Sequence, residues 1–138
     1  MAFLIFALTG CGGGVINAYD GPARASRDVA VLFTPKTNPR VHGGDRAVLS
    51  GVGGKNYGTY MNGYPEVTRV LPGKFMIKVL CYDTSSGSRG LSRFLLLSAD
   101  LEAGHYYELT CDLLTASYVD RGTDYNKVRS LLPESFHD

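Results

Sequence analysis

The clearest pattern in the chain is a run of alternating side chains over residues 74–82. Side chains of a β-strand point alternately to its two faces. One phase of this run holds Phe75, Ile77, Val79 and Cys81, and the other holds Met76, Lys78, Leu80 and Tyr82. Because both phases are largely apolar, the pattern predicts a central strand rather than an edge strand.

Shorter apolar runs, separated by turn residues, predict the remaining strands. They cover residues 29–33, 46–50, 57–61, 66–71, 91–100, 105–112 and 118–119. Asn62-Gly63 and Pro72-Gly73 are turn signals between them. The pattern therefore predicts a mainly β chain with a single antiparallel β-sandwich over residues 29–120. Residues 121–138 are expected to form a C-terminal tail with one helical turn near residues 126–131.

The beginning of the chain follows a different pattern. An apolar run over residues 2–8 ends in Leu8-Thr9-Gly10-Cys11, and no Lys or Arg precedes it. An apolar core followed by small residues is typical of secretory signal peptides. We predict a signal peptide over residues 1–10; the alternative is a buried N-terminal strand in which Cys11 is an ordinary thiol.

This start resembles the lipobox of bacterial lipoproteins, and the resemblance implies that Cys11 carries a diacylglycerol. Two or more acyl chains anchor a protein stably where one chain is marginal. Residues 11–28 are then a lipid anchor and flexible leash. Gly12 stands where Asp is associated with inner-membrane retention. The resemblance thus implies the bacterial cell envelope, with the outer membrane favoured, on its periplasmic side or its surface.

The charge of the chain limits its possible partners, and its cysteine content limits the possible disulfides. Fourteen Lys and Arg residues and thirteen Asp and Glu residues give a net charge of +1, so nucleic acid is not expected as a partner. An odd count of three cysteines is unusual for an exported protein. If Cys11 is lipidated, Cys81 and Cys111 remain as a pair. They form a disulfide if they lie on facing sheets or on neighbouring strands, or they stay buried as free thiols.

The sequence carries no recognisable motif of catalysis or metal binding. His42, His105 and His137 form no i, i+2 or i, i+4 pair, and no cysteine has zinc-ligand spacing. A Gly-x-Ser-x-Gly elbow is also missing. We therefore predict no catalytic residue, no metal and no cofactor, and we expect that the protein is not an enzyme. His105 follows a turn glycine and is expected to form a hydrogen bond at a strand start.

Several motifs together resemble a group of small uncharacterised bacterial lipoproteins. These motifs are Tyr19-Asp-Gly-Pro-Ala-Arg24, Asn62-Gly63, Val70-Leu-Pro-Gly-Lys74 and Ala103-Gly-His-Tyr-Tyr107. The last two also resemble PEGA-like and other prealbumin-like β-sandwich domains. The similarity covers residues 19–33 and 61–112 and implies a prealbumin-like or immunoglobulin-like sandwich. Motifs of this kind describe backbone and core, so they imply the fold better than the function.

The Gly-rich insert at residues 35–60 does not match that group and is where we expect binding. Long connections in compact domains are often functional. A basic and aromatic set suits an acidic protein face or an anionic glycan: Arg40, His42, Arg46, Lys55, Tyr57 and Tyr60. The alternatives are a spacer, or two edge strands that complete the sheet. The expected function is a non-enzymatic binding module for an envelope protein or glycan, and the alternative is a structural accessory subunit of an outer-membrane or periplasmic assembly.

Overall fold

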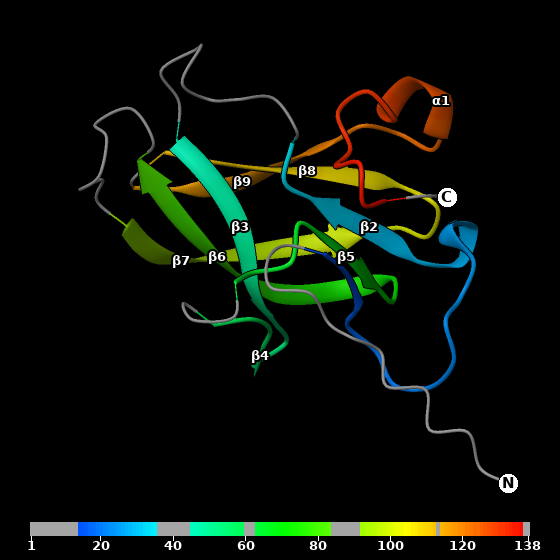
Figure 1. Cartoon of the computed structure of the whole chain (residues 1–138). Helices are drawn as coiled ribbons and strands as arrows, with labels where there is room; N and C mark the ends of the chain where they lie inside the picture. The colour runs from blue at the N-terminus through cyan, green and yellow to red at the C-terminus, as the bar shows by residue number, and fades with distance from the viewer. Residues whose placement is uncertain (1–13, 36–44, 60–62, 84–91, 113, 137–138) are drawn as a thin grey trace, which may run out of the picture.

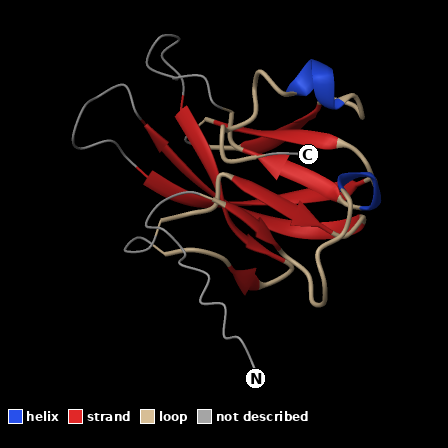
Figure 2. Cartoon of the chain, turned by 45° about the vertical axis from the view of Figure 1, so that its right-hand side comes forward, coloured by secondary structure: helices blue, strands red, loops and turns tan. Residues whose placement is uncertain are grey.

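The structure of the chain is a computed structural model that describes residues 14–35, 45–59, 63–83, 92–112 and 114–136. Two β-sheets make up most of it (Figures 1 and 2). Sheet A has the strand order β1-β5-β2-β8-β9, and sheet B has the order β4-β3-β6-β7. Within these residues the strands are β1 (Val15–Asn17), β2 (Ala30–Phe33), β3 (Asp45–Val52), β4 (Lys55–Asn56), β5 (Val67–Val70), β6 (Gly73–Asp83), β7 (Ser92–Leu101), β8 (Tyr106–Cys111) and β9 (Ala116–Asp120).

The main core lies between the two sheets, and this confirms the predicted mainly β fold. Sheet A contributes residues such as Leu32 and Leu109, and sheet B contributes Ile77 and Val79, all at most 2% exposed. Strand β6 lies between β3 and β7, as its apolar pattern predicts. Its second phase is not buried, however, because Met76 on the outer face is 49% exposed.

Sheet A is mixed rather than antiparallel, which corrects the predicted topology. Strand β2 pairs antiparallel with β5 but parallel with β8, and β1 pairs parallel with β5. Parallel neighbours cannot be joined by a tight hairpin and need a long crossover. Here the chain builds all of sheet B and β5 between β2 and β8. Local turn signals could not reveal this pairing, because it joins strands far apart in the sequence.

The C-terminal segment forms a third layer instead of the predicted tail. The helical turn is present as α1 (Tyr125–Val128), and the carboxylate of Asp124 caps it by accepting from the amide of Asn126. After it the chain lies on the outer face of sheet A (Figure 1). Three apolar side chains that are at most 3% exposed hold it there: Val128, Leu132 and Phe136. The second core that they build contains Val31 and Phe33.

The predicted leash and insert also need correction. Within residues 11–28, β1 is part of sheet A, and a 3₁₀ helix forms at Ser26–Asp28. Within the insert, β3 and β4 complete sheet B through a turn at Gly53-Gly54, where both glycines have positive φ. No strand forms over residues 57–59, which carry only an isolated bridge from Thr59 to Gly63. The described residues of the insert therefore agree with the alternative in which it forms edge strands that complete the sheet.

Candidate functional site

The two cysteines of the β-sandwich are bonded to each other. Cys81 on β6 and Cys111 on β8 form a disulfide with a Cα–Cα distance of 6.0 Å. Their strands belong to different sheets, so the bond joins sheet B to sheet A across the core. Of the alternatives that the sequence left open, the structure therefore has the disulfide, on facing sheets. Cys11, the predicted lipidation site, lies outside the described residues.

The structure describes three of the six residues predicted to bind a partner, and these three do not lie together. Arg40, His42 and Tyr60 lie outside the described residues. Arg46 is the second residue of β3, whereas Lys55 follows the far end of that strand, about 20 Å away at the rise of an extended chain. Tyr57 lies with Lys55, whose Nζ is 5.5 Å from the centre of the tyrosine ring. The interpretation of these three residues as one contact loop was wrong, because the insert is a hairpin that places them at opposite ends.

Arg46 instead borders a hollow on the outer face of sheet B. The hollow has a volume of about 420 Å³ and is lined by Arg46, Val48, Tyr64, Glu66, Leu80, Tyr82 and Ser92. The Nε atom of Arg46 is buried and has no hydrogen-bond partner. A buried unpaired donor is costly, so a ligand acceptor at this point would be favourable. Tyr82 is opposite Arg46 in the register of β3 and β6, a neighbour that linear spacing in the sequence does not reveal.

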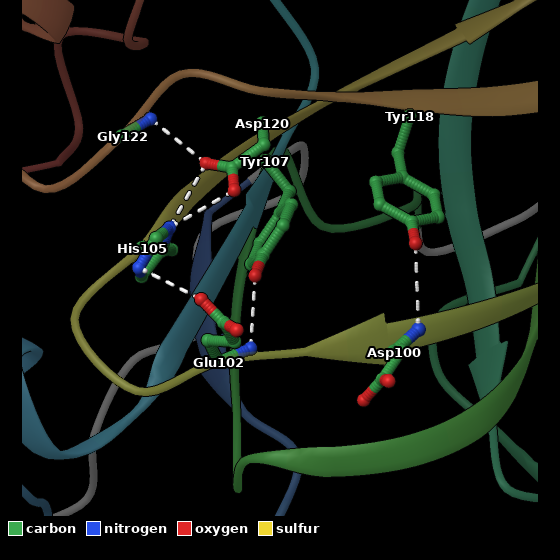
Figure 3. Close-up of polar contacts among 7 residues, drawn as sticks. All are labelled: Asp100, Glu102, His105, Tyr107, Tyr118, Asp120 and Gly122. Carbon is green, nitrogen blue, oxygen red and sulfur yellow. Dashed lines mark hydrogen bonds and ion pairs between the residues drawn. The ribbon is translucent and has the colours of Figure 1, made fainter.

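A second polar cluster lies at the end of the sandwich where β7 turns into β8 (Figure 3). His105 has a carboxylate at each ring nitrogen. Its Nε2 is 3.1 Å from Oε2 of Glu102, and its Nδ1 is 3.0 Å from both carboxylate oxygens of Asp120. The His105 side chain is 23% exposed, against 70% for Glu102 and 44% for Asp120. The prediction that His105 forms a hydrogen bond at a strand start is confirmed.

Backbone geometry places the three side chains of this cluster. Gly104 has a φ of +81° in the turn that precedes His105, and a Cβ there would lie 3.4 Å from the carbonyl oxygen of Arg27. The amide of Gly122 donates to Oδ1 of Asp120 at 2.8 Å and fixes that carboxylate. Behind the cluster, the amide of Glu102 donates to the hydroxyl of Tyr107 at 2.8 Å (Figure 3). Burial raises the pKa of the Tyr107 phenol, and this amide offsets part of the rise.

The geometry of the cluster is compatible with two roles, a set of ion pairs or a cation site. With protons on both nitrogens, the imidazolium pairs with both carboxylates and closes the β7–β8 turn onto β9. Alternatively, one ligand atom each from Glu102, His105 and Asp120, all within 4.8 Å of one another, could surround a cation. In the structure the three side chains contact one another directly, which is the arrangement that the first role needs. Sequence reasoning missed Asp120 as a partner, because it follows His105 by fifteen residues and meets it only through the pairing of β8 with β9.

No helix in the described part of the chain combines the length and apolar character needed to cross a membrane. No family model, curated protein or solved structure matches this chain. The resemblance to lipoproteins and to prealbumin-like domains therefore stays a prediction from motifs.

Proposed function

We propose that this chain is a lipid-anchored protein of the bacterial envelope whose β domain is a non-enzymatic interaction module. The observation that carries the proposal is the disulfide between Cys81 and Cys111. The prealbumin-like or immunoglobulin-like type of the sandwich is part of the same proposal. The two sheets with their shared core support it at the level of fold.

The disulfide supports export because such bonds persist in oxidising compartments and are rare in the cytosol. Cys81 is fully buried at the core, so the bond is part of the packed domain. Pairing of these two residues leaves Cys11 as the remaining cysteine of the chain. It stands directly after an apolar run, where a lipobox cysteine is expected. Anchoring at Cys11 and folding of residues 15–136 then take place in one compartment.

The mode of action is contact with another envelope molecule. The hollow beside Arg46 combines aromatic, aliphatic and charged groups and suits an anionic group of a protein or glycan. The alternative, a structural accessory subunit, is favoured by a different observation. Met76, Phe94 and Leu96 on sheet B are 49%, 57% and 68% exposed, and apolar groups gathered on one face are typical of protein contact sites.

Labelling of intact bacteria with a fatty-acid analogue tests the anchor. We expect label on the native chain and none on Cys11→Ser. The matched control replaces both Cys81 and Cys111 with Ser, which should leave the label in place if the protein still accumulates. Equal labelling of native chain and Cys11→Ser would refute the anchor. Two free thiols in the native exported chain would remove the observation on which the proposal rests.

Contact through the hollow is tested by crosslinking in intact membranes. Arg46→Glu should reduce the yield of crosslinked partner at least about tenfold. The introduced carboxylate would repel an anionic group of the partner in the hollow. Arg93→Glu, which changes the same charge outside the hollow, is the control and should keep the yield. Loss in neither variant or in both would contradict a role for the hollow.

A further inference from the structure

We infer that Arg24, Arg27 and Arg69 form a site for a phosphate group, and that this phosphate belongs to a lipid headgroup of the membrane beside the domain. The membrane as the source of the phosphate rests on the proposed lipid anchor, whereas the site itself rests on the geometry of the three arginines. The surface is separate from the hollow beside Arg46, because the two share no lining residue.

The first observation is that three arginines meet at one surface hollow. This hollow has a volume of about 400 Å³ and is lined by Arg24, Ala25, Ser26, Arg27 and Arg69. The first four precede β2 along the chain, whereas Arg69 lies on β5, so it is the fold that brings the arginines together. The whole chain has a net charge of only +1. Three cations at one hollow are therefore a local concentration of positive charge.

The second observation is that no acidic side chain neutralises this charge. Within the described residues the ion pairs are those of His105 and Arg121, and none involves the three arginines of the hollow. Asp20 and Asp28 belong to the segment before β2, but neither of them lines the hollow. Like charges that the fold holds together repel one another. A bound anion would relieve this repulsion, so the arrangement favours a negatively charged ligand.

The third observation is that the surrounding structure positions two of the guanidinium groups. Arg69 is held by β5, which pairs with β1 on one side and β2 on the other, and its Cζ lies 5.0 Å from the centre of the Phe136 ring. Cζ of Arg24 lies 5.8 Å from the centre of the Tyr19 ring, whose hydroxyl accepts from the Arg24 amide at 2.9 Å. An aromatic ring engages the flat face of a guanidinium, so the N–H donors in its plane stay available for a ligand.

The donors of the hollow suit a phosphate better than a carboxylate. Each guanidinium presents a planar fork of N–H groups that can pair bidentately with either anion. A phosphate has more acceptor oxygens than a carboxylate and can therefore accept from several forks at once. Ser26 adds a hydroxyl to the lining. Three forks and a hydroxyl around one hollow therefore favour a phosphate.

The source of the phosphate follows from where an anchor would join the domain. The carbonyl oxygen of Gly14 accepts from the amide of Val67 on β5. Arg69 follows Val67 by two residues on the same strand, which is about 7 Å at the rise of a β-strand. Surfaces rich in anionic lipids attract basic side chains that lie close to them. A lipid on Cys11 would thus hold the hollow near the headgroup phosphates.

The experiment measures vesicle binding by the full-length Cys11→Ser chain, which cannot carry the proposed anchor, so a failure concerns the arginines and not the anchoring. In cosedimentation, phosphatidylcholine vesicles that contain phosphatidic acid should bind the chain, and pure phosphatidylcholine vesicles should bind it at least about fivefold more weakly. Arg24→Gln, Arg27→Gln and Arg69→Gln should each weaken binding to the anionic vesicles at least about fivefold. Arg93→Gln, on β7 and outside the hollow, is the matched control and should bind like the parent chain.

Further arms of the experiment separate a phosphate site from general charge attraction. Vesicles with equal surface charge supplied by fatty-acid carboxylates should bind the chain more weakly than those with phosphatidic acid. Arg69→Lys, which keeps the charge and removes the fork, should also bind more weakly. Equal binding in both comparisons would overturn the phosphate assignment. Arg24 and Arg27 are exposed, so their variants test the site even if the Arg69 variants do not fold.

A titration with inorganic phosphate separates the two sources of the ligand. Inorganic phosphate should shift the NMR signals of the arginine Nε–H groups in the parent chain, and the shift should be lost in Arg27→Gln. Such a shift without vesicle binding would overturn the lipid headgroup as the source and assign the site to free phosphate. A chain that binds neither inorganic phosphate nor anionic vesicles would overturn the whole proposal. Loss of vesicle binding in Arg93→Gln as well would also overturn it, because the hollow would then have no special role.

Discussion

The outer faces of the two sheets are built from similar residues but end up in different surroundings. On sheet A the outward side chains include Val31 and Phe33, which are at most 1% exposed under the C-terminal segment. On sheet B the outward side chains of β6 and β7 include Met76 and Phe94, which are about half exposed. One sheet is thus covered by its own chain, while the other presents apolar groups to its surroundings.

The difference shows that an apolar phase in a strand does not by itself mean burial. In both sheets the inward phase packs between the sheets, and the fate of the outward phase depends on whether another segment reaches it. The segment after β9 can reach sheet A because β9 is the edge of that sheet. Uncovered apolar groups are expected at contact surfaces. The comparison therefore favours the outer face of sheet B as the contact surface of the proposed interaction module.

The largest predicted effect comes from removing part of the cover of sheet A. Phe136 is 3% exposed and contacts Tyr106 edge-on at a ring distance of 6.3 Å. Phe136→Ala should lower the free energy of unfolding by about 3–5 kcal/mol through cavity formation. Phe94→Ala on sheet B is the matched control and should change it by no more than about 0.5 kcal/mol, because that ring is exposed. Urea denaturation measures both values; equal losses would contradict the contrast between the faces.

An intermediate effect is expected from cutting the covalent link between the sheets. The disulfide joins residues separated by 30 positions. The chain-entropy model gives about 3.5 kcal/mol for a loop of this size. Replacing both Cys81 and Cys111 with Ala should therefore lower the unfolding free energy of the unreduced protein by about this amount. Reducing agent should destabilise the native chain similarly and leave the double variant unchanged; sensitivity of that variant to reductant would contradict the assignment.

The smallest effect concerns pH and the turn that joins β8 to β9 in sheet A. Amides of Leu114 and Thr115 donate to Oδ1 of Asp112 and hold the pKa of that carboxyl below its ordinary value of 3.8. The ionised form is thus favoured by folding. Its contribution is present above that value and is lost as the pH falls through the lower folded pKa.

Asp112→Asn removes this titration while keeping a side-chain oxygen at the turn. Its urea midpoint should fall less steeply than that of the native chain as the pH falls below the ordinary pKa of 3.8. Asp100→Asn, a similar change on the open edge of sheet B, serves as the control. Parallel curves for Asp112→Asn and the native chain would show that the turn hydrogen bonds do not bias protonation.

The fold was predictable where the signal is local. Alternation over residues 74–82 predicted β6 and its central place in the sheet. The turn at Gly53-Gly54 was not recognised as a hairpin, because the insert was judged by its glycine content and length. The packing of Leu132 and Phe136 on sheet A could not be predicted either. Their partners Val31 and Phe33 belong to a distant strand, and the segment has no periodic pattern that reveals its position.

In the candidate site, too, local features could be predicted from the sequence, and contacts between distant strands could not. Counting cysteines singled out Cys81 and Cys111 as a possible pair, but it left open whether they are bonded, because that depends on how the two sheets face each other. The contact of His105 with Asp120 depends on the pairing of β8 with β9. The hollow at Arg46 depends on the register of β3 with β6, which brings Tyr82 opposite it. Long-range registers of this kind are set by packing of the whole domain, so residue spacing alone does not reveal them.

The backbone at Gly14 determines how closely a lipid anchor would hold the domain to a bilayer. The carbonyl oxygen of Gly14 accepts from the amides of Glu66 and Val67, at 3.1 and 3.3 Å, and so belongs to the fixed part of the chain. Three peptide steps separate it from Cys11, a reach of about 10 Å at full extension. With a lipid on Cys11, the domain would stand directly on the lipid headgroups with the β1 edge of sheet A lowest. Large partners could then approach only from the sides and top, and rotation of the domain would be confined largely to the axis normal to the membrane.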